Sequence, residues 1–154
     1  MIMFAYYLQG VAAYCMYMTH KFLADSMVGD VARNMRMLGH DTEYYPHMTQ
    51  YDTLQYATTT GRIILTKNQR LLKKGVCTIY ATTTHGIMKK IVDTFGIATD
   101  IVVSKSRCSI CNGEQRDMDG TRRQCILCGK IYWDGTHIEH MRQIAKTWWQ
   151  SSRV

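Results

Sequence analysis

The chain has 154 residues, of which 46% are hydrophobic and 20% are charged. This composition excludes an intrinsically disordered chain and predicts a globular fold. The length suits one ordinary domain, or a domain of roughly a hundred residues followed by a small unit that needs a metal ion or a disulfide for stability. The formal net charge is +7, and a balance this basic favours an anionic partner.

Residues 1–20 form an uncharged, apolar stretch up to Met18 that is interrupted by several tyrosines. The stretch lacks a basic start and is too polar for a membrane span, so a signal peptide and a membrane helix both fit poorly. We expect an N-terminal extension that is helical and docked. A targeting or anchoring segment, or an extension with little role, stays open from hydropathy alone.

Strand and helix patterns alternate through residues 21–104. Short apolar runs predict strands at 21–25, 42–45, 62–66 and 76–80. Apolar residues at helical spacing predict helices at 27–38, at about 51–61 and at 84–95. This alternation predicts an α/β domain with a parallel sheet flanked by helices.

The chain changes character at Lys105. Residues 105–135 are polar, rich in glycine and contain four cysteines, which predicts a second small unit. Residues 136–154 are predicted to form a C-terminal helix and tail that packs back on one of the two units. Tyr132 and Trp133 are expected to form a small core beneath the second unit; the alternative is that they face a nucleic acid with Arg122, Arg123 and Lys130.

Two CxxC pairs predict a zinc ribbon. Cys108 and Cys111 form one pair and Cys125 and Cys128 the other, with 13 residues between the pairs. Two such knuckles clamp one tetrahedral ion, and four protein ligands leave no open position, so the zinc should be structural. Disulfides or a redox pair are the alternatives. A thiolate site favours an intracellular reducing compartment, either the cytoplasm or an organelle interior.

Glycine and histidine residues next to the knuckles add two smaller predictions. Gly113 and Gly129 follow the two pairs at positions where the backbone must curl back to present amide groups to sulfur. His137 and His140 are surplus as ligands once four thiolates are in place.

A basic stretch lies between Thr53 and Val92, where Lys and Arg occur but no Asp or Glu does. Such a stretch suits a phosphate backbone, although a solvated basic surface is the alternative. The candidate RNA-binding residues in this stretch are Arg62, Lys67, Arg70, Lys73 and Lys74.

Four stretches together resemble a known family, and they follow one another in the family's order. They read FLADSMVGDVARNMRMLGHDTEYY, GRIILTKNQRLL, SRCSICNG and CILCGKIYWDGTH. The chain resembles the Mut-seven C-terminal RNase family, a PIN-like nuclease domain followed by a zinc ribbon. The resemblance covers about residues 21–141, leaves the first 20 residues outside, and has a shorter spacer between the knuckles than the family usually carries.

The resemblance implies a second metal site at the carboxyl edge of the sheet. In PIN-like enzymes, clustered carboxylates hold one or two Mg²⁺ or Mn²⁺ ions there. Asp25 matches the first acid of that pattern, and an N-cap role for the next helix is its alternative. Asp52 and Asn68 are weaker candidate ligands. Asn68 replaces an expected carboxylate with an amide oxygen that coordinates weakly, which should weaken the site. Asp30 is expected on another helix face.

These residues lead to an ordered set of functional hypotheses. The first is a metal-dependent endoribonuclease of PIN-like type acting on RNA, with activity weakened by Asn68. The second is a non-catalytic zinc-ribbon RNA-binding protein, such as a component of a ribonucleoprotein particle. A toxin-like partner in a protein pair is the third. Association with a membrane is not expected.

Overall fold

A computed structural model gives the structure of residues 20–73 and 75–150. The extension predicted over residues 1–20 therefore lies outside the described residues, apart from His20. The α/β class and the parallel sheet flanked by helices are confirmed. No helix in the described ranges is both long enough and apolar enough to cross a bilayer.

A four-stranded parallel sheet forms the centre of the first unit. Its strands are β1 (Phe22–Ala24), β2 (Thr42–Tyr44), β3 (Ile63–Thr66) and β4 (Thr78–Tyr80), in the order β2-β1-β3-β4. Phe22 lies opposite Thr42 on one side and Ile63 on the other. All four strands therefore end at the same edge of the sheet, which we call the C-terminal edge.

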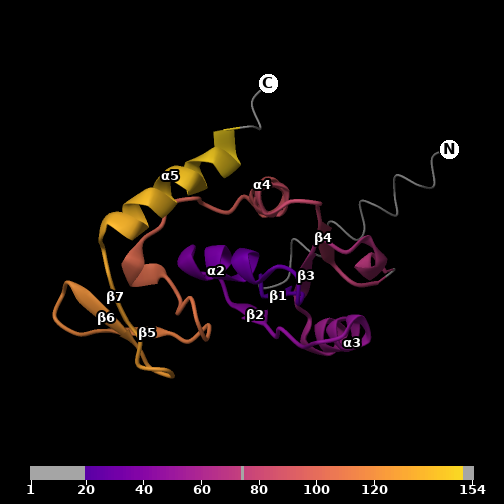
Figure 1. Ribbon diagram of the computed structural model, residues 1–154, viewed down its shortest axis with the longest axis horizontal. Coiled ribbons are helices and arrows are strands. Elements are labelled where there is room, and N and C mark those ends of the chain that lie inside the picture. The colour runs from indigo at the N-terminus through magenta and orange to yellow at the C-terminus, as the bar shows by residue number, and fades with distance from the viewer. Residues whose placement is uncertain (1–19, 74, 151–154) are drawn as a thin grey trace.

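Helices cover both faces of this sheet (Figure 1), namely α2 (Gly29–Met37) and α4 (Thr84–Phe95) on one face and α3 (Gln50–Thr60) on the other. The alternation of strand side chains explains the two layers. Phe22 and Ile63 pack with α2 and α4, while Leu23 and Ile64 pack with α3. The central strands are buried on both faces, which is why they read as continuous apolar runs.

Local signals set the helix boundaries. Thr49 caps α3 and forms a capping box with Asp52, and Gly61 ends the helix with φ of +67°. The first predicted helix begins at Gly29 and not at Met27, because residues 26 and 27 form a turn fastened to Asp25. The other predicted elements agree with the structure to within two residues.

The second unit is a three-stranded antiparallel sheet of β5 (Gln115–Asp117), β6 (Arg122–Cys125) and β7 (Ile131–Trp133). It is linked to the first unit through a short helix, η2 (Val103–Lys105). After β7 the chain enters α5 (Thr136–Gln150), which returns to the α/β unit. Ala145 and Trp148 of α5 join the core beside α4, so the C-terminal helix packs back as expected.

Candidate functional site

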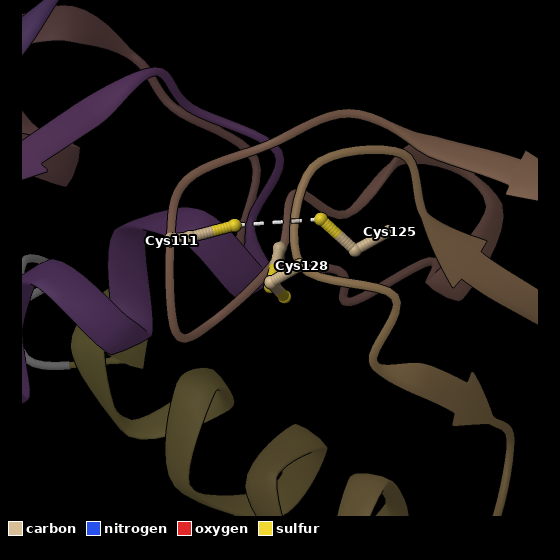
Figure 2. A group of neighbouring side chains, drawn as sticks. Cys111, Cys125 and Cys128 are labelled. Atoms are coloured by element: carbon tan, nitrogen blue, oxygen red, sulfur yellow. Dashed lines mark hydrogen bonds between the residues drawn. The ribbon is translucent and has the colours of Figure 1, made fainter.

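The four predicted thiols converge between the two CxxC loops. The Sγ atoms of the four cysteines all lie within 4.8 Å of one another. Cys108 and Cys128 are 3.5 Å apart at sulfur, and Cys111 and Cys125 are 3.4 Å apart. Figure 2 shows Cys111, Cys125 and Cys128 pointing toward one another from the two loops. A tetrahedral zinc ion with Zn–S of about 2.3 Å requires sulfurs about 3.8 Å apart, so this donor set fits zinc closely.

Backbone geometry around the cysteines explains the small residues there. Gly129 has φ of +77° in the second knuckle, as expected from its position. In the first knuckle the left-handed residue is Asn112, with φ of +64°, and not Gly113. Gly113 is needed for space, because a Cβ atom there would lie 2.8 Å from Cys125 Sγ.

Hydrogen-bond donors prepare Cys108 to bind as a thiolate. Burial raises the pKa of Cys108, but donors led by the Tyr132 hydroxyl and the nearby backbone amides lower it overall, to about 6. The Tyr132 hydroxyl lies 3.0 Å from Cys108 Sγ and accepts from Ser109 N. Tyr132 is thus a half-buried support of the knuckle, as expected for a small core. The same expectation is wrong for Trp133, which is 61% exposed.

Arg36 fastens the first knuckle to the α/β unit. This side chain of α2 is 5% exposed and donates to the carbonyl oxygens of Ser109 and Ile110 at 3.0 and 3.1 Å. Its Nε donates to Thr42 O at 2.8 Å. Burial lowers the pKa of Arg36, and the charges of Cys108 and Cys111 oppose that effect. One guanidinium therefore joins α2, β2 and the thiol cluster.

A second polar contact lies beside Arg36. Asn112 Nδ2 donates to Asp41 Oδ1 at 2.7 Å, and Asn112 Oδ1 accepts from Thr42 N. Arg62, a predicted RNA ligand, donates to Asp41 at 3.0 Å and to Glu43 at 2.8 Å. Arg62 is only 9% exposed, so its charge is neutralised inside the protein and we leave it out of any RNA surface.

Asp25 follows β1 directly and uses both carboxylate oxygens inside the protein. Oδ1 accepts from Met27 N at 2.8 Å, and Oδ2 accepts from the hydroxyl of Thr66 at the end of β3. The residue is 4% exposed. Val28, not Asp25, is the N-cap residue of α2. Asp25 therefore fastens the turn before the helix and joins two strand ends.

The other predicted acidic-site residues have structural partners of their own. The backbone of Asn68 donates to Thr66 Oγ1, while its side chain accepts from Arg70 N and caps the short helix η1 (Gln69–Leu71). Asp52 accepts from Thr49 N and its hydroxyl in the capping box of α3. Neither side chain shares a hydrogen-bond partner with the Asp25 carboxylate.

Asp30 lies at the C-terminal edge, although the helical spacing predicted that it would lie on another face of the helix. Its Oδ2 accepts from the Thr84 hydroxyl at the start of α4 and lies 4.0 Å from Lys67 Nζ. The first turn of α2 faces the chain that leaves β3, so an acid five residues after Asp25 still reaches this edge. The sequence signal that predicts Asp30 at this edge is the end of a strand followed by only a short turn before the helix.

Both donor sets fall within the range matched by one family model. The profile described as the Mut7-C RNAse domain matches residues 20–145. The chain belongs to the Mut7-C RNAse domain family. The matched range spans the α/β unit, the ribbon and most of α5, and it confirms the family resemblance found in the sequence. No curated protein and no solved structure matches the chain.

The catalytic Mg²⁺ or Mn²⁺ ion that the PIN-like resemblance implies has no cluster of three acidic ligands among the described residues of this Mut7-C chain. Mg²⁺ takes six oxygen ligands, of which one or two are usually protein carboxylates and several are waters. Within residues 20–73 and 75–150, only the four cysteines bring three or more potential metal ligands together. Asp25 is already hydrogen-bonded at both oxygens, and Asn68 turns its amide toward Arg70.

The basic residues between Thr53 and Val92 differ in how exposed they are to an RNA ligand. Arg70 and Lys73 are exposed on and just after η1, and Lys67 is partly exposed beside Asp30. All three follow the end of β3 at the C-terminal edge. Lys74 lies outside the described residues.

Proposed function

We propose that the protein binds RNA at the C-terminal edge of its sheet and holds a structural zinc ion in its ribbon. The observation that supports RNA binding most directly is the position of Lys67, Arg70 and Lys73, which follow β3 at that edge. Lysine and arginine at a sheet edge neutralise phosphates, and each contact releases counterions. Membership of an RNase family supports RNA as the partner.

Cleavage is not part of this first proposal, because Asn68 replaces an expected negative charge and no three acidic groups converge at the edge within the described residues. The Asp25 carboxylate serves a turn and a threonine hydroxyl, and Asn68 caps a short helix. Loss of even an outer-shell partner reduces metal affinity or activity by roughly 10- to 100-fold in metalloenzymes. A protein that keeps the basic edge and the ribbon, but has Asn68 in place of an acidic ligand, suits a component of a ribonucleoprotein particle.

A metal-dependent endoribonuclease with Asp25 as principal ligand is the second candidate. The observation in its favour is that Asp25 and Asp30 both lie at the C-terminal edge, beside the Thr66 to Asn68 segment. Asp30 is half exposed, with 51% of its side chain accessible, and supplies negative charge where Asn68 does not. Asp52 is a minor contributor to this candidate, because its carboxylate caps α3 through Thr49.

One assay separates the two candidates. Zinc-loaded full-length protein is mixed with labelled single-stranded and structured RNA in Mn²⁺, and both binding and strand scission are followed. We expect wild type and Asp25→Asn to bind RNA and to leave it intact. The matched control is Asp100→Asn, because Asp100 is exposed and far along the chain from the sheet edge.

The outcomes are distinct. Hydrolysis by wild type that disappears in Asp25→Asn, but persists in Asp100→Asn, would establish the endoribonuclease. Hydrolysis that appears only in Asn68→Asp would identify a disarmed nuclease and support the first proposal. Wild-type protein that binds no RNA at low salt would refute it.

A further inference from the structure

Two neighbouring pockets lie between the α/β unit and the ribbon and share part of their lining. The first, of about 500 Å³, is lined by residues of α2, β2, both cysteine knuckles and the start of α5; they include Gly29, Arg33, Tyr44, Lys130 and His137. The second, of about 340 Å³, lies between β7 and the start of α5. Ser109, Lys130 and His137 line both pockets. We call the two together the ribbon groove.

The first chamber of the ribbon groove is cationic. Its described lining contains no carboxylate. Arg33, Lys130 and His137 are exposed, and none of the three makes an ion pair with another described residue. Lys130 only lies over the Tyr132 ring, with Nζ 5.5 Å from the centroid. Arg33 and Lys130 are therefore available to phosphate oxygens, and the His137 ring can donate a hydrogen bond beside them.

The second chamber offers an aromatic and apolar wall. Trp133 is 61% exposed beside Met37, Ile131 and Ile138. An exposed tryptophan at the mouth of a pocket is a stacking platform for an unpaired base. The volume lies at the lower end of the range of roughly 300 to 1,000 Å³ that small-ligand pockets occupy.

An unsatisfied amide lines the same chamber. Gln115 Nε2 and Oε1 are both shielded from water, and neither has a hydrogen-bond partner within the described ranges. A buried amide without partners costs free energy that a polar ligand edge would recover. A glutamine amide carries one donor and one acceptor group side by side, which is the arrangement that pairs with a base edge.

The groove opens toward the basic sheet edge. Gly29 begins α2, which follows the Asp25 turn, and Tyr44 ends β2 at the same edge. The Tyr44 hydroxyl donates to Ser26 O at 3.4 Å, which ties this wall of the groove to the turn. In Figure 1 the zinc ribbon lies beside α2. A third, smaller pocket runs along the same helix and has Asp30, Arg33 and Met37 in its lining.

We propose that single-stranded RNA passes from the C-terminal edge into the ribbon groove. Its phosphates contact Arg33, Lys130 and His137, and one unpaired base enters the chamber beside Trp133. The proposal rests on the RNA-binding function above and gives the ribbon a role in addition to stability. A duplex does not satisfy it, because the bases of a duplex are stacked and cannot enter a side pocket.

The cationic chamber is tested by RNA affinity over a salt series without added divalent ions. The variant is Arg33→Glu/Lys130→Glu, and the control is Lys146→Glu, an exposed lysine of α5 outside the groove. We expect the groove variant to bind at least about 10-fold more weakly at low salt. The slope of log K against log salt should fall by about 0.7 for each phosphate of the single strand that the variant no longer neutralises.

The base chamber is tested with Trp133→Ala, Trp133→Phe and Gln115→Leu. We expect Trp133→Ala to bind single-stranded RNA about 5- to 150-fold more weakly, which corresponds to one stacked base. Trp133→Phe should recover part of the loss. Gln115→Leu should reduce any preference among homopolymers without the loss of overall affinity seen in Trp133→Ala. Zinc content and thermal unfolding of each variant show whether the fold is retained.

The results separate this inference from the function on which it rests. Wild-type protein that binds no RNA would refute both. Wild-type binding that the groove variant weakens no more than Lys146→Glu does would leave RNA binding at the sheet edge and overturn the groove path. Equal affinity for a duplex and a single strand, or no effect of Trp133→Ala, would overturn the base chamber.

Discussion

The two knuckles and the C-terminal edge both carry residues that bind metals, yet their surroundings differ. Four thiols from separate loops meet within 4.8 Å. At the sheet edge, Asp25 is held by Met27 and Thr66, and Asn68 by Arg70. The knuckle backbone curls so that the four thiols face one another, whereas the side chains of Asp25 and Asn68 face hydrogen-bond donors of their own neighbouring segments.

This contrast shows that ligand identity and ligand convergence are separate properties. Cysteine pairs with two residues between them carry their geometry in the local turn. Carboxylates at strand ends depend on several distant elements, and each carboxylate has hydrogen-bond donors available nearby. The two regions should therefore respond differently to substitution, and the thiol cluster should respond most strongly.

Cys111→Ser should abolish the zinc centre. Removing one of four thiolates takes away a ligand from a unit whose folding depends on metal binding on the order of 10 kcal/mol. Zinc content by mass spectrometry should fall from one equivalent, and amide exchange across residues 108–133 should accelerate. The control is Ile126→Ser, which changes an exposed neighbour of Cys125. Full zinc content in Cys111→Ser would show that the site does not need four thiolates.

Arg36→Met should lower the free energy of unfolding by about 3 to 5 kcal/mol, because three carbonyl groups lose a buried cationic donor. Urea unfolding measures the change. Arg33→Met, on the same helix but exposed, should stay within about 0.5 kcal/mol of wild type. Equal effects of the two substitutions would mean that Arg36 does not fasten the ribbon.

Asp41→Asn should cost about 1 to 3 kcal/mol at neutral pH, because two guanidinium hydrogen bonds lose their charged acceptor. Burial raises the pKa of Asp41, but hydrogen bonds from Arg62 and Asn112 hold it below its ordinary value overall. The stability from ionised Asp41 is therefore complete above the unfolded pKa of about 3.9 and is lost as pH falls through the lower folded pKa.

Urea midpoints at neutral pH and in acid test this dependence. Wild type should lose more stability on acidification than Asp41→Asn does. Asp100→Asn, at an exposed position, should keep the wild-type dependence. An unchanged acid dependence in Asp41→Asn would assign that dependence to other carboxylates.

Asp52→Ala should have the weakest effect of these substitutions, a loss of roughly 0.3 to 1 kcal/mol from the first turn of α3. Its carboxylate serves Thr49 in the capping box, so we expect unchanged RNA affinity. Thermal unfolding and RNA titration of the same preparation provide both values. A fall in RNA affinity without a change in stability would return Asp52 to the site.

Sequence patterns were sufficient for features that depend on neighbours in the chain. The spacing of Val28, Val31 and Met35 predicted the buried face of α2, and the CxxC pairs predicted the thiol cluster. The strand ends placed Asp25 at the C-terminal edge.

Contacts between distant residues were beyond the sequence. Arg36 lies 73 positions from Ser109, and nothing in an amphipathic helix distinguishes a buried arginine from a solvated one. Arg62 belongs to a basic run, but Asp41 and Glu43 neutralise it from another strand. Trp133 was expected to be buried, because a large aromatic residue next to a ribbon usually packs; here its strand is at the edge of the small sheet.

Metal binding at the two regions can be measured in one preparation. Zinc content gives the occupancy of the four thiols, and Mn²⁺ titration followed by electron paramagnetic resonance reports binding at the sheet edge. We predict one equivalent of zinc and no saturable Mn²⁺ binding that depends on Asp25. A saturable Mn²⁺ site that is present in wild type and absent from Asp25→Asn would contradict this account, because it would show that the Asp25 carboxylate binds a metal ion in addition to its two hydrogen-bond donors.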